Sequence, residues 1–106
     1  MSVTDGVNYT VLGREWRCKW SEDDDKASLK ALQALNDTYV PAVKAMAGFQ
    51  GATRTVCGGC KDFKLQFRFA AADLIDLPGV AEWLAAAGSI PGVSECATQT
   101  YTLAEL

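Results

Sequence analysis

The chain has 106 residues, of which 49% are hydrophobic and 22% charged, with a formal net charge of −3. This length and apolar content predict one domain spanning residues 1–106 with a modest core, and they argue against intrinsic disorder. Histidine is absent, which excludes Ser-His and Cys-His nucleophile pairs and histidine-ligated metal sites.

Charge and hydropathy also narrow the partners and the compartment. A nucleic-acid-binding domain usually carries a basic excess, so the acidic balance argues against that function. Residues 1–6 lack the basic and apolar regions of a signal peptide, and no apolar run approaches the roughly 20 residues of a membrane span. We therefore expect a cytoplasmic protein that binds neither membranes nor nucleic acid.

Residues 9–20 alternate in polarity, which predicts a long strand with one buried face. The buried face would carry Leu12, Trp16, Cys18 and Trp20, with Arg14 among them. The opposite face would carry Val11, Gly13, Glu15, Arg17 and Lys19.

A long helix is predicted next. Ser21 can cap its N-terminus, and the acidic residues 22–25 complement the positive end of the helix dipole. Apolar residues then recur at helical spacing: Leu29, Leu32, Leu35, Tyr39, Val43 and Met46. Pro41 lies within this stripe and should kink or divide the helix near residues 38–40.

Three further strands and a second helix follow. Residues 52–57 and 60–69 read as two strands joined by a two-residue turn at Gly58-Gly59. Asp76 can cap a helix that ends at Gly88. Its inner stripe would contain Leu77, Ala81, Leu84 and Gly88, flanked by Val80 and Ala87. Residues 93–103 form the last strand.

The resulting order, β-α-β-β-α-β, predicts a ferredoxin-like α+β fold. Four antiparallel strands in the order 4-1-3-2 would form one sheet, with two helices on one face.

Several segments resemble the dimeric α+β barrel superfamily. The first strand ends in Lys19-Trp20-Ser21, and the long helix passes through Val40-Pro41-Ala42 into the turn of residues 47–51. A hairpin ending in the apolar strand through Phe69 precedes a shorter helix. The chain looks like small stress-responsive, monooxygenase-like and uncharacterised members. This resemblance implies a homodimer with facing sheets and a ligand cavity between sheet and helices.

A candidate pocket follows from these expectations. Arg14 lies on an apolar strand face and needs a polar partner. With Trp16, Asn36, Tyr39 and Trp83 it would surround a small apolar or aromatic molecule. Core packing is the alternative for the aromatic residues. A cofactor-independent monooxygenase or cyclase-like enzyme, with Trp16, Asn36 and Tyr39 positioning the substrate, is the alternative function. No metal or cofactor is expected.

Two other groups leave alternatives open. Cys57 and Cys60 could be structural thiols, a disulfide or redox pair, or part of a zinc site with Cys18 and Cys96. The charged strand face, with Arg17, Lys64 and Arg68 and with Arg54 as a further candidate, could be solvated, form ion pairs across a dimer interface, or bind an anionic small molecule.

Overall fold

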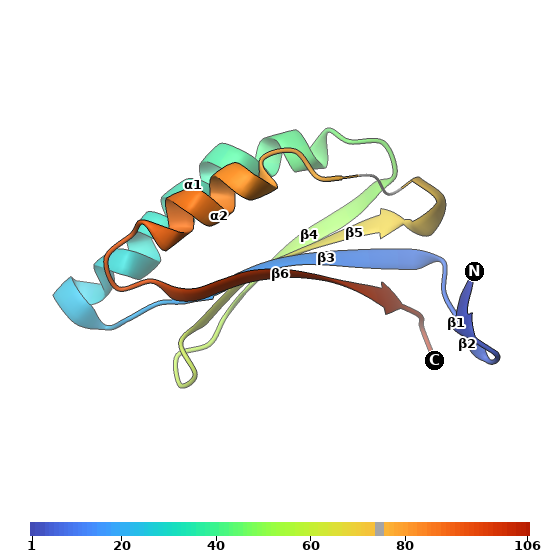
Figure 1. The fold of residues 1–106 in the computed structure, drawn as a ribbon, viewed down its shortest axis with the longest axis horizontal. Helices are drawn as coiled ribbons and strands as arrows, with labels where there is room; N and C mark the ends of the chain where they lie inside the picture. Colours follow the sequence, from blue (N-terminus) through green and yellow to red (C-terminus); the bar gives the residue numbers. More distant parts are fainter. Residues whose placement is uncertain (74–75) are drawn as a thin grey trace.

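The computed structural model describes residues 1–73 and 76–106 and has an α+β fold (Figure 1). The elements are β1 (Ser2–Thr4), β2 (Val7–Asn8), β3 (Val11–Lys19), α1 (Asp23–Lys44), β4 (Phe49–Val56), β5 (Asp62–Ala70), a 3-10 turn (Ala71–Asp73), α2 (Val80–Gly88) and β6 (Ser94–Leu103). Strands β4-β5-β3-β6 form an antiparallel sheet in that order, and both helices lie on one face of it. The predicted α+β class is confirmed, and the arrangement is compatible with a ferredoxin-like fold.

An N-terminal hairpin of β1 and β2 was not predicted. It forms a separate two-stranded sheet that projects beyond the start of β3 (Figure 1). The Tyr9 N–H donates to the Met1 carbonyl at 2.9 Å, so Tyr9 belongs to this hairpin and β3 begins only at Val11. Met1, Val3 and Val7 are exposed on the hairpin, which therefore contributes apolar surface rather than core.

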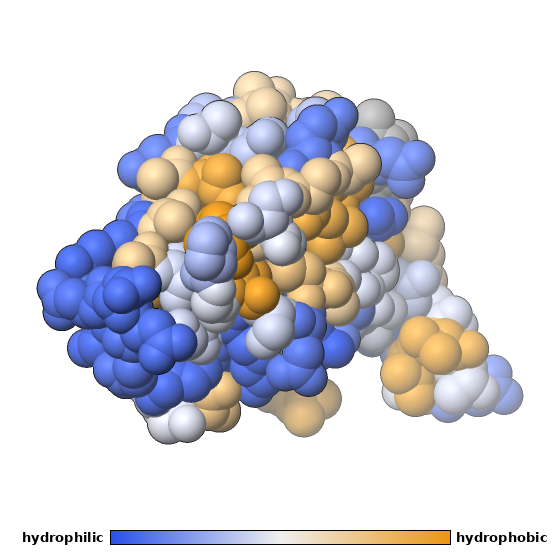
Figure 2. Space-filling view, turned by 60° about the vertical axis from the view of Figure 1, so that its left-hand side comes forward, coloured by the Kyte–Doolittle hydropathy of each residue, from blue (hydrophilic) through white to orange (hydrophobic). Residues whose placement is uncertain are grey.

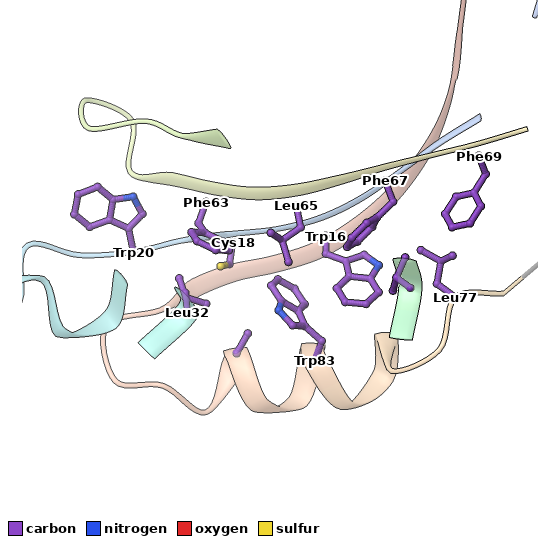
Figure 3. Packing of buried hydrophobic residues seen from close by; sticks show 12 residues of the cluster. Trp16, Cys18, Trp20, Leu32, Phe63, Leu65, Phe67, Phe69, Leu77 and Trp83 are labelled. Atoms are coloured by element: carbon purple, nitrogen blue, oxygen red, sulfur yellow. The ribbon is translucent and has the colours of Figure 1, made fainter. Parts of the chain in front are cut away.

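The core fills the layer between the sheet and the helices (Figure 3). Strand β3 contributes Trp16 and Cys18, Trp20 follows directly after it, and β5 contributes Phe63, Leu65, Phe67 and Phe69. Helix α1 contributes Leu32 and Val43, helix α2 contributes Trp83 and Ala87, and the segment before α2 contributes Leu77. The period-two alternation predicted for β3 and β5 is confirmed on this face.

The first helix departs from prediction at its start and at Pro41. The Ser21 N–H donates to Ser28 Oγ at 2.9 Å, and Ser28 Oγ donates to the Ser21 carbonyl at 3.2 Å. This tertiary pairing holds the Ser21 backbone, while its own hydroxyl makes no hydrogen bond to the described residues; the predicted Ser21 cap is wrong. The helix also continues through Pro41 with helical backbone angles. Pro41 and Asp37 are both exposed, so water can satisfy the carbonyl that the proline leaves unpaired.

The second helix begins four residues after the predicted Asp76 cap. Gly79 precedes it with φ +81°, and the Trp83 N–H donates to the Gly79 carbonyl at 2.8 Å. This positive φ sets the start and therefore the rotational phase of the helix. Trp83 and Ala87 face the core, whereas Ala81 and Gly88, predicted to face inward, are exposed.

The β4–β5 connection is longer than predicted. Strand β4 ends at Val56 and β5 begins at Asp62, so five residues (57–61) replace the expected two-residue turn. The Cys57 N–H donates to the Asp62 carbonyl at 3.0 Å, and Lys61 takes a positive φ of 62°. The loop is therefore closed between Cys57 and Asp62, and not by a two-residue turn at Gly58-Gly59.

Candidate functional site

A groove of about 200 Å³ lies between α1 and β4, at the edge of the helix-covered face. Its lining residues are Asn36, Val40 and Lys44 from α1, Ala52, Thr53 and Arg54 from β4, and Leu65 and Phe67 from β5. Leu65 and Phe67 are buried core residues, whereas Lys44 and Arg54 are exposed. The groove therefore combines an apolar base with two cationic side chains.

The position of Arg54 follows from the alternation of β4. Ala52 and Arg54 pair with Phe67 and Leu65 of β5, so they share the helix-covered face. There the Arg54 guanidinium donates a hydrogen bond to Gln33 Oε1 of α1. This contact ties the edge strand to the helix and holds one cation beside the groove. Among the described lining residues there is no carboxylate to neutralise Arg54 and Lys44.

Of the five residues predicted to share a pocket, the structure brings Trp16 and Trp83 into contact and places Arg14, Asn36 and Tyr39 in other surroundings. Trp16 and Trp83 are 1% and 0% exposed, and their ring centroids are 5.5 Å apart in the core (Figure 3). Tyr39 packs against Gly79 at the start of α2. Asn36 lines the α1–β4 groove, and Arg14 pairs with Phe67 and Thr100 in the sheet register.

Arg14 was singled out because an arginine on an apolar strand face needs a polar partner, and the structure shows such an unpaired group within the part of the chain that it describes. It is half-buried, and its Nε is buried without a hydrogen-bond partner among the residues described. Trp83 Nε1 is in the same situation deeper in the core. The sequence analysis missed the groove residues Val40 and Lys44, and it offered Arg54 for the opposite, charged face, which the pairing with Leu65 corrects. The available signal was the alternation along β4, which puts Arg54 on the same face as Ala52.

The sheet face opposite the helices contains a buried carboxylate. Glu15 is 4% exposed, and Gln66 Nε2 donates to its Oε1 at 3.4 Å. Its Oε2 lies 3.8 Å from Arg17 Nη1 and makes no hydrogen bond within the described part of the chain. Tyr101 lies over Gly13, close to Glu15. Burial raises the pKa of the Tyr101 hydroxyl, and the negative charge of Glu15 adds to that effect.

The other end of this open face is rich in ion pairs. Lys19 Nζ lies 2.6 Å from Asp62 Oδ1, and Lys64 Nζ lies 3.9 Å from Asp62 Oδ2. The hydrogen bond from Lys19 and its charge hold the pKa of the Asp62 carboxyl below its usual value. Asp62 thus offsets part of the positive charge predicted for this face. A hollow of about 280 Å³ lies here, lined by Arg17, Cys18, Lys19, Asp62, Lys64 and Glu95.

The cysteines divide into two pairs. Cys57 and Cys60 form a disulfide across the β4–β5 loop, with their Cα atoms 5.6 Å apart. Cys18 and Cys96 are free. Burial, reinforced by Cys96, raises the pKa of the Cys18 thiol to about 12. The described residues contain no group of three or more cysteine or carboxylate side chains placed to hold a metal ion, and no described helix is long and apolar enough to span a membrane.

The sequence matches no protein-family model and no curated protein. The structure is similar to that of Rv0793 from Mycobacterium tuberculosis, with a TM-score of 0.62 and 15% sequence identity. The similarity covers 92% of this chain and 98% of Rv0793. At this identity the likeness establishes a shared fold.

Proposed function

We propose that this protein is a small homodimer that binds a small apolar or aromatic molecule carrying an anionic group, in the groove between α1 and β4. The observation that carries the ligand proposal is the combination of an apolar base, Leu65 and Phe67, with Lys44 and Arg54. Binding sites commonly join apolar walls to a few polar groups that orient the ligand. The volume of about 200 Å³ suits a molecule of one or two rings.

The dimer half of the proposal, with the two chains arranged as a dimeric α+β barrel, rests on the open sheet face. Glu15 is almost fully buried there, yet its Oε2 finds no hydrogen bond among the described residues. A buried charge is costly unless it is paired. Arg17, 3.8 Å away, has a side chain that is 45% exposed and can reach a second molecule. A second copy of this chain, facing the first, would bring its own Arg17 to Glu15.

An enzyme of the monooxygenase or cyclase-like kind on the same fold is less well supported. It would require Trp16, Asn36 and Tyr39 to contact one substrate. Trp16 packs against Phe67 and Trp83 in the core, whereas Asn36 faces the groove. This separation favours binding over catalysis by these residues.

The ligand proposal can be tested with the fluorescent pair 2-naphthoate and 2-naphthol, which differ in charge. We expect 2-naphthoate to bind more tightly, because only its carboxylate can pair with Lys44 and Arg54. Lys44→Ala should weaken 2-naphthoate binding about fivefold, corresponding to ~1 kcal/mol for one partly exposed charge pair. Val40→Trp should abolish binding by filling the groove.

The matched control is Lys30→Ala. It removes the same charge from the same helix, but Lys30 is exposed and bound to Asp25 rather than to the groove. Equal binding of both probes, or 2-naphthoate affinity unchanged by Val40→Trp, would overturn the ligand proposal. Sedimentation of the unmodified protein tests the dimer separately, and a monomer throughout the micromolar range would refute it.

A further inference from the structure

The disulfide between Cys57 and Cys60 is placed where another molecule can reach it. It closes the tip of the loop between β4 and β5, which extends away from the helices (Figure 1). Cys60 is exposed and Cys57 is half-buried. Gly58 and Gly59 between them are also exposed, and apart from their chain neighbours no described atom lies within 4 Å of the position that a Cβ would take on either. The Cys60 sulfur is therefore open to attack by a thiolate from solution.

The surroundings of the two sulfurs differ. The Cys60 N–H donates to Cys57 Sγ at 3.1 Å, whereas Cys60 Sγ lies 3.3 Å from Asp62 Oδ2. A hydrogen-bond donor stabilises a thiolate, and a neighbouring carboxylate disfavours one. After reduction, Cys57 can hold the negative charge, while the Cys60 thiol can donate to Asp62. Attack on Cys60 Sγ with Cys57 as the leaving thiolate is thus favoured, because the better-stabilised thiolate leaves more readily.

The loop is anchored by contacts that do not depend on the disulfide. The Cys57 N–H donates to the Asp62 carbonyl at 3.0 Å, and the Trp20 N–H donates to the Lys61 carbonyl at 2.9 Å. Lys61 Nζ lies 3.0 Å from Glu22 Oε1 at the start of α1 and 5.0 Å from the centroid of the Trp20 ring. These contacts can hold the hairpin in place whether the sulfurs are bonded or free. The disulfide is therefore not required to hold the β4–β5 hairpin in its folded position.

We propose that Cys57 and Cys60 form a reversible site for thiol–disulfide exchange with thiols of low molecular weight. Residues 57–61 carry no apolar side chain apart from the two cysteines, so the loop offers little to select a protein surface. A small thiol needs no such recognition. The site lies on the β4–β5 loop, away from the groove between α1 and β4, and it does not depend on ligand binding there.

The exchange has two steps. The thiolate of the first small thiol attacks Cys60 Sγ, the bond between the two protein sulfurs breaks, and Cys57 leaves as a thiolate held by the Cys60 N–H. A second thiolate then attacks the small-thiol sulfur of the mixed disulfide and releases Cys60, which takes a proton and donates to Asp62. The protein gains two electrons, and two small thiols become one small disulfide. The reverse steps reoxidise the protein.

The first test uses glutathione and the unmodified protein. Folded protein is equilibrated in millimolar mixtures of reduced and oxidised glutathione, quenched by alkylation and mapped by mass spectrometry. We expect Cys57 and Cys60 to change between the oxidised and alkylated forms together, with an unchanged near-ultraviolet circular dichroism spectrum. A pair that stays oxidised throughout, or that is reduced only as the spectrum of the folded state disappears, would refute the proposal.

The second test compares Cys57→Ser with Cys60→Ser, each of which leaves one sulfur in the loop. The rate of alkylation against pH gives the pKa of the remaining thiol. We expect the Cys57 thiol, in Cys60→Ser, to titrate about one pH unit or more below the Cys60 thiol, in Cys57→Ser. Asp62→Asn, added to Cys57→Ser, should lower the pKa of the Cys60 thiol. Equal pKa values in the two single variants, or the reverse order, would contradict the assigned direction of bond breaking.

Discussion

Reversing the charge of Arg17 gives the sharpest test of the proposed dimer. Arg17 lies on the open sheet face, and its guanidinium is 3.8 Å from the buried Glu15 carboxylate. In a dimer related by a two-fold axis, each chain would present Arg17 to Glu15 of the other, so the contact would occur twice. Arg17→Glu would replace two attractions with two repulsions. The Arg17 side chain is 45% exposed in the single chain, so the variant should still fold.

The expected size of the effect follows from the burial of Glu15. Removing one partner of a buried charged pair costs about 2–5 kcal/mol at an interface. Two such contacts give about 4–10 kcal/mol, and each 1.4 kcal/mol changes the dissociation constant about tenfold. Even the lower end raises that constant about a thousandfold. A micromolar dimer would then be monomeric at the concentrations used in sedimentation.

Arg54→Glu is the matched control, because it makes the same charge change on the helix-covered face of the same sheet. It should leave the sedimentation coefficient of the dimer unchanged. A chain carrying Glu15→Arg should not self-associate, but mixed with the Arg17→Glu chain it should form a heterodimer, provided that its thermal unfolding remains cooperative. If Arg17→Glu sediments like the unmodified protein, or if Arg54→Glu disrupts the dimer equally, the interface does not involve this face.

Two further predictions concern the core. Trp83→Ala should lower the free energy of unfolding by about 3–5 kcal/mol, because it empties a fully buried site. Trp83→Phe should cost clearly less, since it keeps an aromatic ring and removes the Nε1 donor, which lacks a partner among the described residues; equal urea midpoints for the two variants would contradict this reasoning. Cys18 should make stability depend on pH. Its pKa is about 12 in the folded protein and near the ordinary value of 9.0 in the unfolded chain, so its contribution is fully present below pH 9 and is lost as the pH rises toward 12. Urea unfolding at pH 8 and pH 10 should show the decrease, and Cys18→Ala should reduce it.

The patterns that could be read from the sequence are those set by neighbouring residues in one strand. The alternation of Trp16, Cys18 and Trp20, and that of Phe63 to Phe69, depends only on the pleat of a strand. Both were predicted, and both match the buried face. The two helices were likewise predicted from local periodicity, in their case from apolar residues at helical spacing.

The errors arise where a distant residue changes a local preference. Ser21 has the chemistry of a helix cap, but Ser28 pairs with its backbone instead. The start of α2 depends on the positive φ of Gly79, which packs against Tyr39. A helical stripe drawn from Asp76 is therefore rotated away from the observed core face.

The candidate site shows the same limit. The sequence placed Asn36 on the inner side of α1, but its neighbours across the groove come from β4 and β5. Which residues meet there depends on how α1 crosses the sheet. Short-range periodicity carries no such information. The N-terminal hairpin escaped prediction because its strands, of three and two residues, contribute nothing to the core.

The contact between Gly13 and Tyr101 has a consequence for how the sequence can vary. A Cβ placed on Gly13 would come within 2.6 Å of the Tyr101 ring, so the ring occupies the volume that any other residue at position 13 would need. A larger residue at position 13 would turn Tyr101 outward and let water reach Glu15. Homologues in which this carboxylate stays buried should therefore conserve the glycine and the tyrosine together, or change both at once. Figure 2 shows another part of the surface, with hydrophilic residues gathered on its left-hand side and hydrophobic residues nearer its centre. Positions 13 and 101, separated by nearly the whole length of the chain, would then covary among homologues.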